Sequence, residues 1–204
     1  MATRGRPRAF DRDSALRRAM LMFWERGYEA TSISDLTAAM GINSPSLYAA
    51  FGCKEALFRE SVELYGNTEG AATRRALLEE PTARDAVESM LRSNADMFTD
   101  SRHPTGCLVV QGAGNGNRDI SDFLTACRRS NYEALRERLD HAVAEGELPE
   151  ETDTDAVARF YTTVLYGLTI HARDGANRAQ LQLAVTAAMA AWEETVRTAG
   201  EHVG

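Results

Sequence analysis

Residues 31–58 read TSISDLTAAMGINSPSLYAAFGCKEALF, and this stretch predicts two short helices joined by a tight turn. The first helix should begin at Ser32, whose side chain can cap the backbone N–H three residues further on. It should end before Gly41, because glycine readily adopts the left-handed backbone that closes a helix. A second helix should follow at once, since Ser44 is a suitable N-cap and Pro45 stands where a missing N–H costs nothing.

The second helix, expected over residues 45–51, is only about two turns long. A few apolar side chains suffice to dock the pair on its neighbours: Ile33, Leu36, Ile42, Leu47 and Phe51. The outward face of the second helix then carries small and hydroxyl-bearing residues: Ser44, Ser46, Tyr48 and Ala49. A supporting helix, a tight turn and a short outward helix are typical of a helix-turn-helix, which places its second helix in the major groove of DNA.

A third helix should precede this pair. Its apolar residues repeat at the spacing of one helical stripe that ends at Gly27: Leu16, Ala19, Met20, Phe23 and Trp24. Upstream, residues 1–9 are too short and polar to pack, and they predict a flexible basic arm. Because such an arm can enter a minor groove, three of its arginines are candidate DNA contacts: Arg4, Arg6 and Arg8.

The chain has 204 residues, of which 44% are hydrophobic, so it can bury one large core or two small ones. No apolar run approaches the roughly 18 residues of a membrane span, and the N-terminus lacks the apolar stretch of a signal peptide. We therefore expect a soluble, cytoplasmic protein without a membrane partner. Three widely spaced cysteines without a CxxC pair predict reduced thiols rather than a disulfide framework or a zinc site: Cys53, Cys107 and Cys127.

Charge is unevenly distributed along the chain, whose formal net charge is -7. Residues 1–54 carry eight Arg or Lys against five Asp or Glu, whereas residues 55–204 carry fifteen against twenty-five. The positive excess places a nucleic-acid partner at the N-terminal end. Lys54, the only lysine, should lie in the first turn of the next helix, where its charge and the free backbone N–H groups can both meet a phosphate.

Beyond Lys54 the apolar residues keep helical spacing and we find no convincing strand, so the predicted fold class is all-α. Further helices are expected over residues 54–80 with a bend near the glycines, 82–98, a short stretch from 107, 119–145, 153–172 and 178–198. The predicted domains are the arm (1–9), the helix-turn-helix domain (10–53) and a larger helical domain (54–204).

The last two expected helices carry apolar and alanine-rich stripes that suit close helix packing. A helix-turn-helix of this size reads a palindrome only when it is paired, so we predict a homodimer built on these two helices. The interface candidates are Val157, Tyr161, Val164, Leu168, Ala184, Ala187, Ala188, Ala191 and Trp192. Alternatively, these stripes are buried within the same subunit.

Taken together, the Arg-rich arm, FWERGYEATSISDLTAAMGI (23–42) and SPSLYAAFGCKEALF (44–58) closely resemble the N-terminal domain of the tetracycline-repressor (TetR/AcrR) family of bacterial transcription regulators. The resemblance covers about residues 8–60, with weaker support from PTGCLVV (104–110) and the last two helices. It implies a homodimeric, all-helical repressor of double-stranded operator DNA, whose C-terminal domain binds an effector and forms the dimer.

The resemblance also assigns roles to single residues. Ser44 and Ser46 would touch bases or phosphates, Pro45 a thymine methyl group, and Tyr48 a phosphate through its hydroxyl. Phosphate contacts are further implied for Thr31, Ser32 and Lys54. Cys53 departs from the polar residue expected at its position, which raises the question of thiol sensing.

Thioether, thiol and aromatic side chains of the C-terminal part suit an adaptable apolar cavity, although most of them would equally suit a core. The candidates for an effector cavity are Met90, Met97, Phe98, Cys107, Phe123, Cys127, Tyr132, Tyr161, Tyr166 and His171. We therefore predict a repressor that leaves a palindromic operator when a small apolar or aromatic molecule binds.

Two alternatives remain open: a repressor of the same fold that responds to thiol oxidation, and a helical enzyme or small-molecule carrier. An enzyme would need a catalytic constellation, and the sequence offers none. The segment GAGNGN (112–117) has neither the preceding strand nor the Gly-Lys-Ser/Thr of a phosphate loop, and the four histidines lack metal-ligand spacing. We expect no enzymatic activity, no cofactor and no metal.

Overall fold

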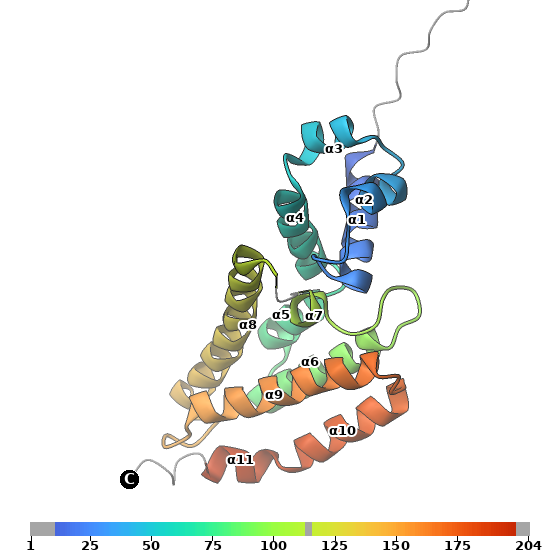
Figure 1. Ribbon diagram of the computed structural model, residues 1–204. Coiled ribbons are helices and arrows are strands. Elements are labelled where there is room, and N and C mark those ends of the chain that lie inside the picture. The colour runs from blue at the N-terminus through green and yellow to red at the C-terminus, as the bar shows by residue number, and fades with distance from the viewer. Residues whose placement is uncertain (1–10, 113–115, 199–204) are drawn as a thin grey trace, which may run out of the picture.

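The computed structural model describes residues 11–112 and 116–198, and within these residues it consists of helices without a strand (Figure 1). This confirms the all-α prediction. The helices are α1 (Arg12–Arg26), α2 (Ile33–Met40), α3 (Ser44–Phe51), α4 (Lys54–Asn67), α5 (Ala71–Glu79), α6 (Ala83–Phe98), α7 (Leu108–Gln111), α8 (Arg118–Ala144), α9 (Thr154–Arg173), α10 (Arg178–Ala190) and α11 (Trp192–Thr198).

Local capping sets the boundaries of the first three helices. Ser32 and Asp35 form the expected capping box at the start of α2, and Gly41 closes this helix with φ +70°. The cap of α3 differs from the prediction: the Asn43 side chain accepts the Ser46 N–H at 2.8 Å, and Ser44 is already the first helical residue. Asparagine and serine cap about equally well, so two adjacent candidates left the choice to the local backbone.

The helix expected over residues 54–80 is two helices, α4 and α5, which are separated at residues 68–70. The Gly70 N–H donates to the Tyr65 carbonyl at 2.8 Å, and a Cβ atom on Gly70 would lie only 2.8 Å from the Tyr65 ring. The chain therefore turns tightly over Tyr65 rather than bending smoothly. The helix expected over 178–198 is likewise broken, at Ala191, directly before the buried Trp192.

Two hydrophobic cores hold these helices together. The first joins α1 to α4 with α7 and the beginning of α8, and the second joins α5, α6, the rest of α8 and α9 to α11. Figure 1 shows α1 to α3 at one end of the molecule, α9 and α10 crossing the other end, and α4 leading from one to the other. Because α4 belongs to the first core, that core extends past residue 53; the division into domains at this residue stays a prediction.

Candidate DNA interface and regulatory cavity

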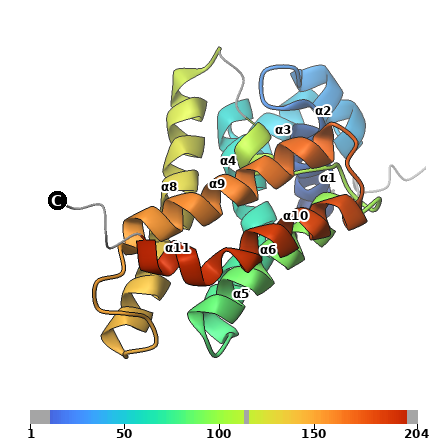
Figure 2. The ribbon, with the colours of Figure 1, turned by 90° about the horizontal axis from the view of Figure 1, so that it is seen from below.

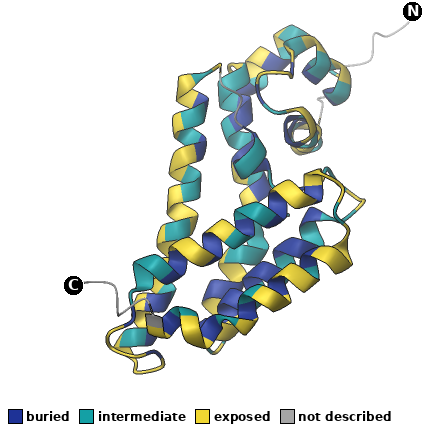
Figure 3. Cartoon of the chain, turned by 60° about the horizontal axis from the view of Figure 1, so that its bottom comes forward, coloured by how far each residue is buried: buried dark blue, intermediate teal, exposed yellow. Residues whose placement is uncertain are grey.

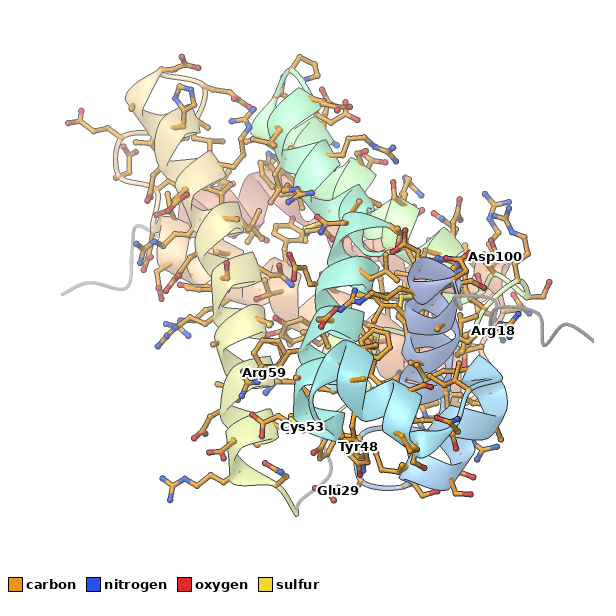
Figure 4. All side chains as sticks on the ribbon, turned by 90° about the horizontal axis from the view of Figure 1, so that it is seen from above. Arg18, Glu29, Tyr48, Cys53, Arg59 and Asp100 are labelled. Atoms are coloured by element: carbon orange, nitrogen blue, oxygen red, sulfur yellow. The ribbon has the colours of Figure 1, made fainter. Side chains whose placement is uncertain are left out.

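Helix α3 presents one face to the first core and the other to solvent. Leu47 and Phe51 are buried, whereas Tyr48 is 48% exposed at the end of the molecule where Figure 4 labels it. Within the described residues no hydrogen bond engages the Tyr48 hydroxyl, so this group is available to an outside acceptor. Ser44 and Ser46 are half-buried beside it, and Pro45 is exposed. None of the four predicted recognition residues on α3 is buried.

Lys54 is the first residue of α4, immediately after the predicted recognition helix. Its Nζ lies 4.1 Å from the centroid of the Tyr28 ring, and burial lowers the pKa of this lysine while the charge of Glu29 opposes that shift. Cys53 caps the helix, because its Sγ accepts the Ala56 N–H at 3.4 Å. The cysteine therefore fills the role of the polar residue expected there, and the ring holds the ammonium group beside the helix N-terminus.

Thr31 does not offer its hydroxyl to a phosphate in this structure. The residue is fully buried, and its Oγ1 donates to the Gly27 carbonyl at 2.7 Å, which ties the segment before α2 to the end of α1. Ser32 is exposed, but its Oγ exchanges hydrogen bonds with Asp35 as the cap of α2. The predicted contacts Arg4, Arg6 and Arg8 lie outside the described residues.

A cavity of about 720 Å³ lies at the junction of the two cores. Helices α4, α5, α6, α8 and α9, together with the segment that begins α7, supply its walls. Five of the predicted residues line it: Phe98, Cys107, Phe123, Cys127 and Tyr166. Its volume is in the range of small-molecule sites, about 300 to 1,000 Å³. Since Val62 belongs to the first core and Leu165 to the second, one molecule in the cavity would touch both.

The other five predicted residues do not line the cavity. Met90 and Tyr161 are buried inside the second core, and Met97 packs between the two cores. Tyr132 is half-buried with its hydroxyl donating to the Asp155 carboxylate, and His171 is exposed near the end of α9. Helical spacing selected suitable side chains without showing which neighbouring helix each would face.

Sequence reasoning missed the contribution of α4 and of charged side chains to the cavity. Val62 and Tyr65 line it from α4, and three arginines reach it from α4, α5 and α8: Arg59, Arg74 and Arg128. Figure 4 shows Arg59 extending from α4 towards α8, where its guanidinium stacks 4.5 Å from the Phe123 ring centroid. An arginine that directly follows a buried apolar residue, as Arg59 follows Phe58, gives no signal in a sequence that distinguishes it from an ordinary surface residue.

The two cysteines of the cavity are protonated thiols rather than thiolates. Burial raises the pKa of Cys107 and of Cys127, and the Tyr65 hydroxyl hydrogen-bonds the Cys107 thiol. Cys53 is exposed, and none of the three is in a disulfide. Within residues 11–112 and 116–198, no group of three His, Cys, Asp or Glu side chains is placed to hold a metal ion.

Two sets of contacts join the cavity wall to the helix-turn-helix. Glu60 lines the cavity and accepts hydrogen bonds from Arg12 Nη2 at 2.7 and 3.0 Å. The same Arg12 donates to the Ala50 carbonyl at 3.3 Å and stacks 4.5 Å from the ring centroid of Phe51, at the end of α3.

The second set runs through an aromatic pair at the end of α1. The Tyr65 ring lies edge-on to Trp24, with 4.8 Å between ring centroids, and Tyr65 also lines the cavity. Trp24 Nε1 donates to the Gly106 carbonyl at 3.2 Å, and Cys107 of the cavity wall follows directly. The aromatic pair thus joins the cavity wall to α1, whereas Glu60 and Arg12 alone separate the cavity from the end of α3.

The predicted dimer residues divide between buried and exposed positions. Val157, Tyr161, Leu168 and Trp192 are buried in their own subunit, so for these four the alternative of packing within one subunit holds. Ala184 and Ala187 are exposed, and Val164, Ala188 and Ala191 are half-buried.

The outward face of α9 and α10 carries exposed large apolar residues: Phe160, Ile170 and Leu183. Figure 2 shows these two helices lying side by side, and Figure 3 shows exposed positions recurring along both of them. This face, with Ala184 and Ala187, is called the α9–α10 face below.

An outward recognition helix joined by direct contacts to a separate ligand-sized cavity defines the class of ligand-responsive helix-turn-helix regulators. The sequence model of the bacterial regulatory proteins of the tetR family matches residues 15–61. ComR, an HTH-type transcriptional repressor of Escherichia coli K12, is 34% identical over 199 residues, which span 96% of this chain and 95% of ComR.

A solved structure extends the similarity to the whole fold. A cysteine-substituted variant of the TetR family regulator CifR, in complex with 26-base-pair operator DNA, is 46% identical with a TM-score of 0.87, over 92% of this chain and 100% of CifR. The chain belongs to the TetR family and is a DNA-binding transcriptional regulator. In the described part of the chain, no helix is both long and apolar enough to cross a membrane.

Proposed function

We propose that this protein is a homodimeric repressor that binds a palindromic operator and leaves it when a small molecule with an apolar body occupies the cavity. The observation that carries this proposal is that Glu60 and Tyr65 line the cavity and also contact Arg12 and Trp24 of α1. A ligand that displaces either side chain would act directly on the helix that supports α3. The similarity to the repressors ComR and BdcR of Escherichia coli supports repression rather than activation of transcription.

On the DNA side, α3 would enter the major groove with Pro45 and Tyr48 leading, because both residues are exposed. The half-buried Ser44 and Ser46 can follow at base edges or phosphates. Lys54 would contact a phosphate together with the N–H groups that begin α4. Thr31 does not belong to the proposed interface, because its hydroxyl is buried and donates to the Gly27 carbonyl.

For dimerisation, the α9–α10 face is the surface we propose. Leu183 is 69% exposed, and the neighbouring small residues Ala184 and Ala187 would let a second copy approach closely. Two copies related by a twofold axis would form a four-helix interface. Their recognition helices could then seat about 34 to 36 Å apart, one turn of duplex DNA.

The mechanism requires that ligand and operator favour different arrangements of the two helix-turn-helix domains of the dimer. In this structure, the contacts of Arg12 with Glu60, Ala50 and Phe51 hold α4 and the end of α3 together. A ligand that moves α4 would carry α1 and α3 with it in each subunit. The two recognition helices of the dimer must fit consecutive major grooves. A small rotation of the helix-turn-helix domain in each subunit would therefore weaken binding at both half-sites.

The first experiment is a footprint of the purified full-length protein on the DNA upstream of its own gene, at low salt. We expect protection of two inverted half-sites centred about one helical turn apart. Tyr48→Ala should abolish the footprint while the helical circular dichroism stays unchanged, because Tyr48 is exposed. Failure of the wild-type protein to protect any sequence in this region would contradict the proposal.

The second experiment fills the cavity by mutation, so that no effector needs to be known. Cys127→Trp places an indole ring in the cavity, whereas Ala126→Trp places the same ring at the exposed neighbouring position. Allosteric couplings are commonly worth about 5- to 150-fold in affinity, so we expect Cys127→Trp to weaken operator binding by at least fivefold. Ala126→Trp should bind as the wild type does. Equal operator affinity of both variants would argue against a regulatory cavity.

A further inference from the structure

The cavity concentrates positive charge inside an acidic part of the chain. Residues 55–204 carry fifteen basic and twenty-five acidic side chains, yet three arginines line the cavity against two carboxylates, those of Glu60 and Glu63. Glu60 is paired with Arg12, and Arg59 with Glu55 at 2.8 Å.

The two remaining arginines bind only neutral oxygen atoms. Arg74 Nη2 donates to Asn67 Oδ1 at 3.3 Å, and Arg128 donates to the Val109 carbonyl at 3.0 Å and to Thr125 Oγ1 at 2.9 Å. Within the described residues, neither has a carboxylate at ion-pair distance. With Glu63 as the remaining carboxylate, the cavity keeps an excess of one positive charge.

Arg128 is the more deeply placed of the two, since it is half-buried whereas Arg74 is exposed. Its charge acts on three groups of the cavity wall: burial raises the pKa of Cys107, Cys127 and Tyr166, and the guanidinium opposes this rise at each of them. Among the residues that the structure describes, two of its five N–H donors are engaged in the contacts above, which leaves three for a ligand.

The rest of the wall suits an apolar body. The side chains of Val62, Phe98, Val109, Phe123 and Leu165 line the cavity from five different elements, so they surround a ligand rather than form one flat surface. Several neutral polar side chains of the wall are already engaged within the protein: the Asn94 amide donates to Thr73 Oγ1 and to the Met90 carbonyl, and the Tyr166 hydroxyl donates to the Arg128 carbonyl. The charged side chains and the apolar side chains together describe a molecule with one charged end.

We infer that the ligand of this cavity is an amphipathic monoanion, an aliphatic or aromatic body that carries one carboxylate, with the carboxylate bound by Arg128 and attracted into the cavity by Arg74. A planar guanidinium matches a carboxylate through two parallel hydrogen bonds, and a partly desolvated pair of this kind is stronger than a neutral one. A single negative charge balances the excess of one positive charge. This inference rests on the proposed function, in which the same cavity controls operator release.

The test compares three probes of equal chain length: decanoate, methyl decanoate and decanol, each below its micellar concentration. Binding to the full-length dimer is measured by calorimetry, and operator release by fluorescence anisotropy. Hydrogen bonds to a charged partner predict that decanoate binds roughly ten- to a hundredfold more tightly than the ester or the alcohol. Decanoate should also release the operator at a correspondingly lower concentration.

Matched variants identify the residue responsible. Arg128→Gln should lower decanoate affinity to that of the ester and leave ester affinity unchanged, whereas Arg129→Gln removes the same charge at the exposed neighbouring position and should change neither. Arg74→Gln and Arg75→Gln form a second pair, because Arg75 does not line the cavity. A merely structural loss would weaken acid and ester alike, so the acid-to-ester ratio reports the carboxylate contact itself.

The outcomes separate this inference from the proposed function. If the ester and the alcohol bind and release the operator as well as decanoate does, the monoanion is wrong while the regulatory cavity stands. If Arg128→Gln keeps the acid-to-ester ratio of the wild type, the assignment of the carboxylate to Arg128 is wrong. If no probe binds, both the inference and the regulatory cavity are overturned.

Discussion

The ion pair between Arg12 and Glu60 gives the sharpest prediction about coupling, because it joins the cavity wall to the end of α3. Both side chains are partly exposed, 45% for Arg12 and 34% for Glu60, so their interaction is worth about 0.2 to 1 kcal/mol rather than the larger value of a buried pair. If this contact transmits cavity occupancy, Glu60→Gln should reduce the coupling between cavity and operator by up to roughly fivefold.

The coupling is measured as the ratio of operator Kd values with the cavity filled by Cys127→Trp and with native Cys127. This ratio is determined by anisotropy in the wild-type and Glu60→Gln backgrounds. Glu69→Gln is the matched control, because Glu69, in the turn that follows α4, also pairs with α1, through Arg17, but does not line the cavity. The reasoning is refuted if Glu60→Gln leaves the ratio unchanged, or if Glu69→Gln reduces it equally.

Three further predictions concern DNA contact, dimerisation and thiol reactivity. Tyr48→Phe should leave stability unchanged, weaken operator binding and flatten the slope of log Kd against log salt by about one phosphate contact; an unchanged slope would remove its hydroxyl from the interface. Leu183→Asp should yield a folded monomer by analytical ultracentrifugation, whereas Leu78→Asp, at a comparably exposed 77%, should stay dimeric; dimerisation of both variants would exclude the α9–α10 face. Burial raises the pKa of Cys107, so its thiolate is scarce at neutral pH. Alkylation of Cys107, followed by mass spectrometry, should therefore be slower than that of the exposed Cys53 at pH 7, and its rate should still increase above pH 9. Equal alkylation rates at pH 7 would support thiol-based regulation instead.

Features that depend on a few neighbouring residues could be predicted from the sequence. The capping box at Ser32 and the left-handed Gly41 act within one turn, so the ends of α2 were predicted correctly. The choice of Asn43 over Ser44 as a cap, and the tight turn of Gly70 over Tyr65, depend on the exact course of the backbone. Sequence pattern alone does not give that course.

Features that depend on how distant helices meet were only partly predictable. Tyr161 and Trp192 have the apolar character of interface residues, but they pack on each other within one subunit, with 5.5 Å between ring centroids. The exposed Ile170 and Leu183 were passed over as candidates for the interface. Similarly, Arg128 lies on a helix with many exposed charges, and only its position between α7 and α9 reveals that it faces the cavity.

The central claim is that cavity occupancy changes the distance between the two helix-turn-helix domains of the dimer. It can be measured with spin labels on Cys53, which is exposed and directly follows α3, after Cys107→Ser has removed one buried thiol. Position 127 carries Ser in the empty-cavity dimer and Trp in the filled one. Double electron–electron resonance should show a single narrow distance for the operator-bound empty-cavity dimer and a clearly shifted distribution for the filled-cavity dimer. Superimposable distributions for the filled and operator-bound proteins would contradict the mechanism.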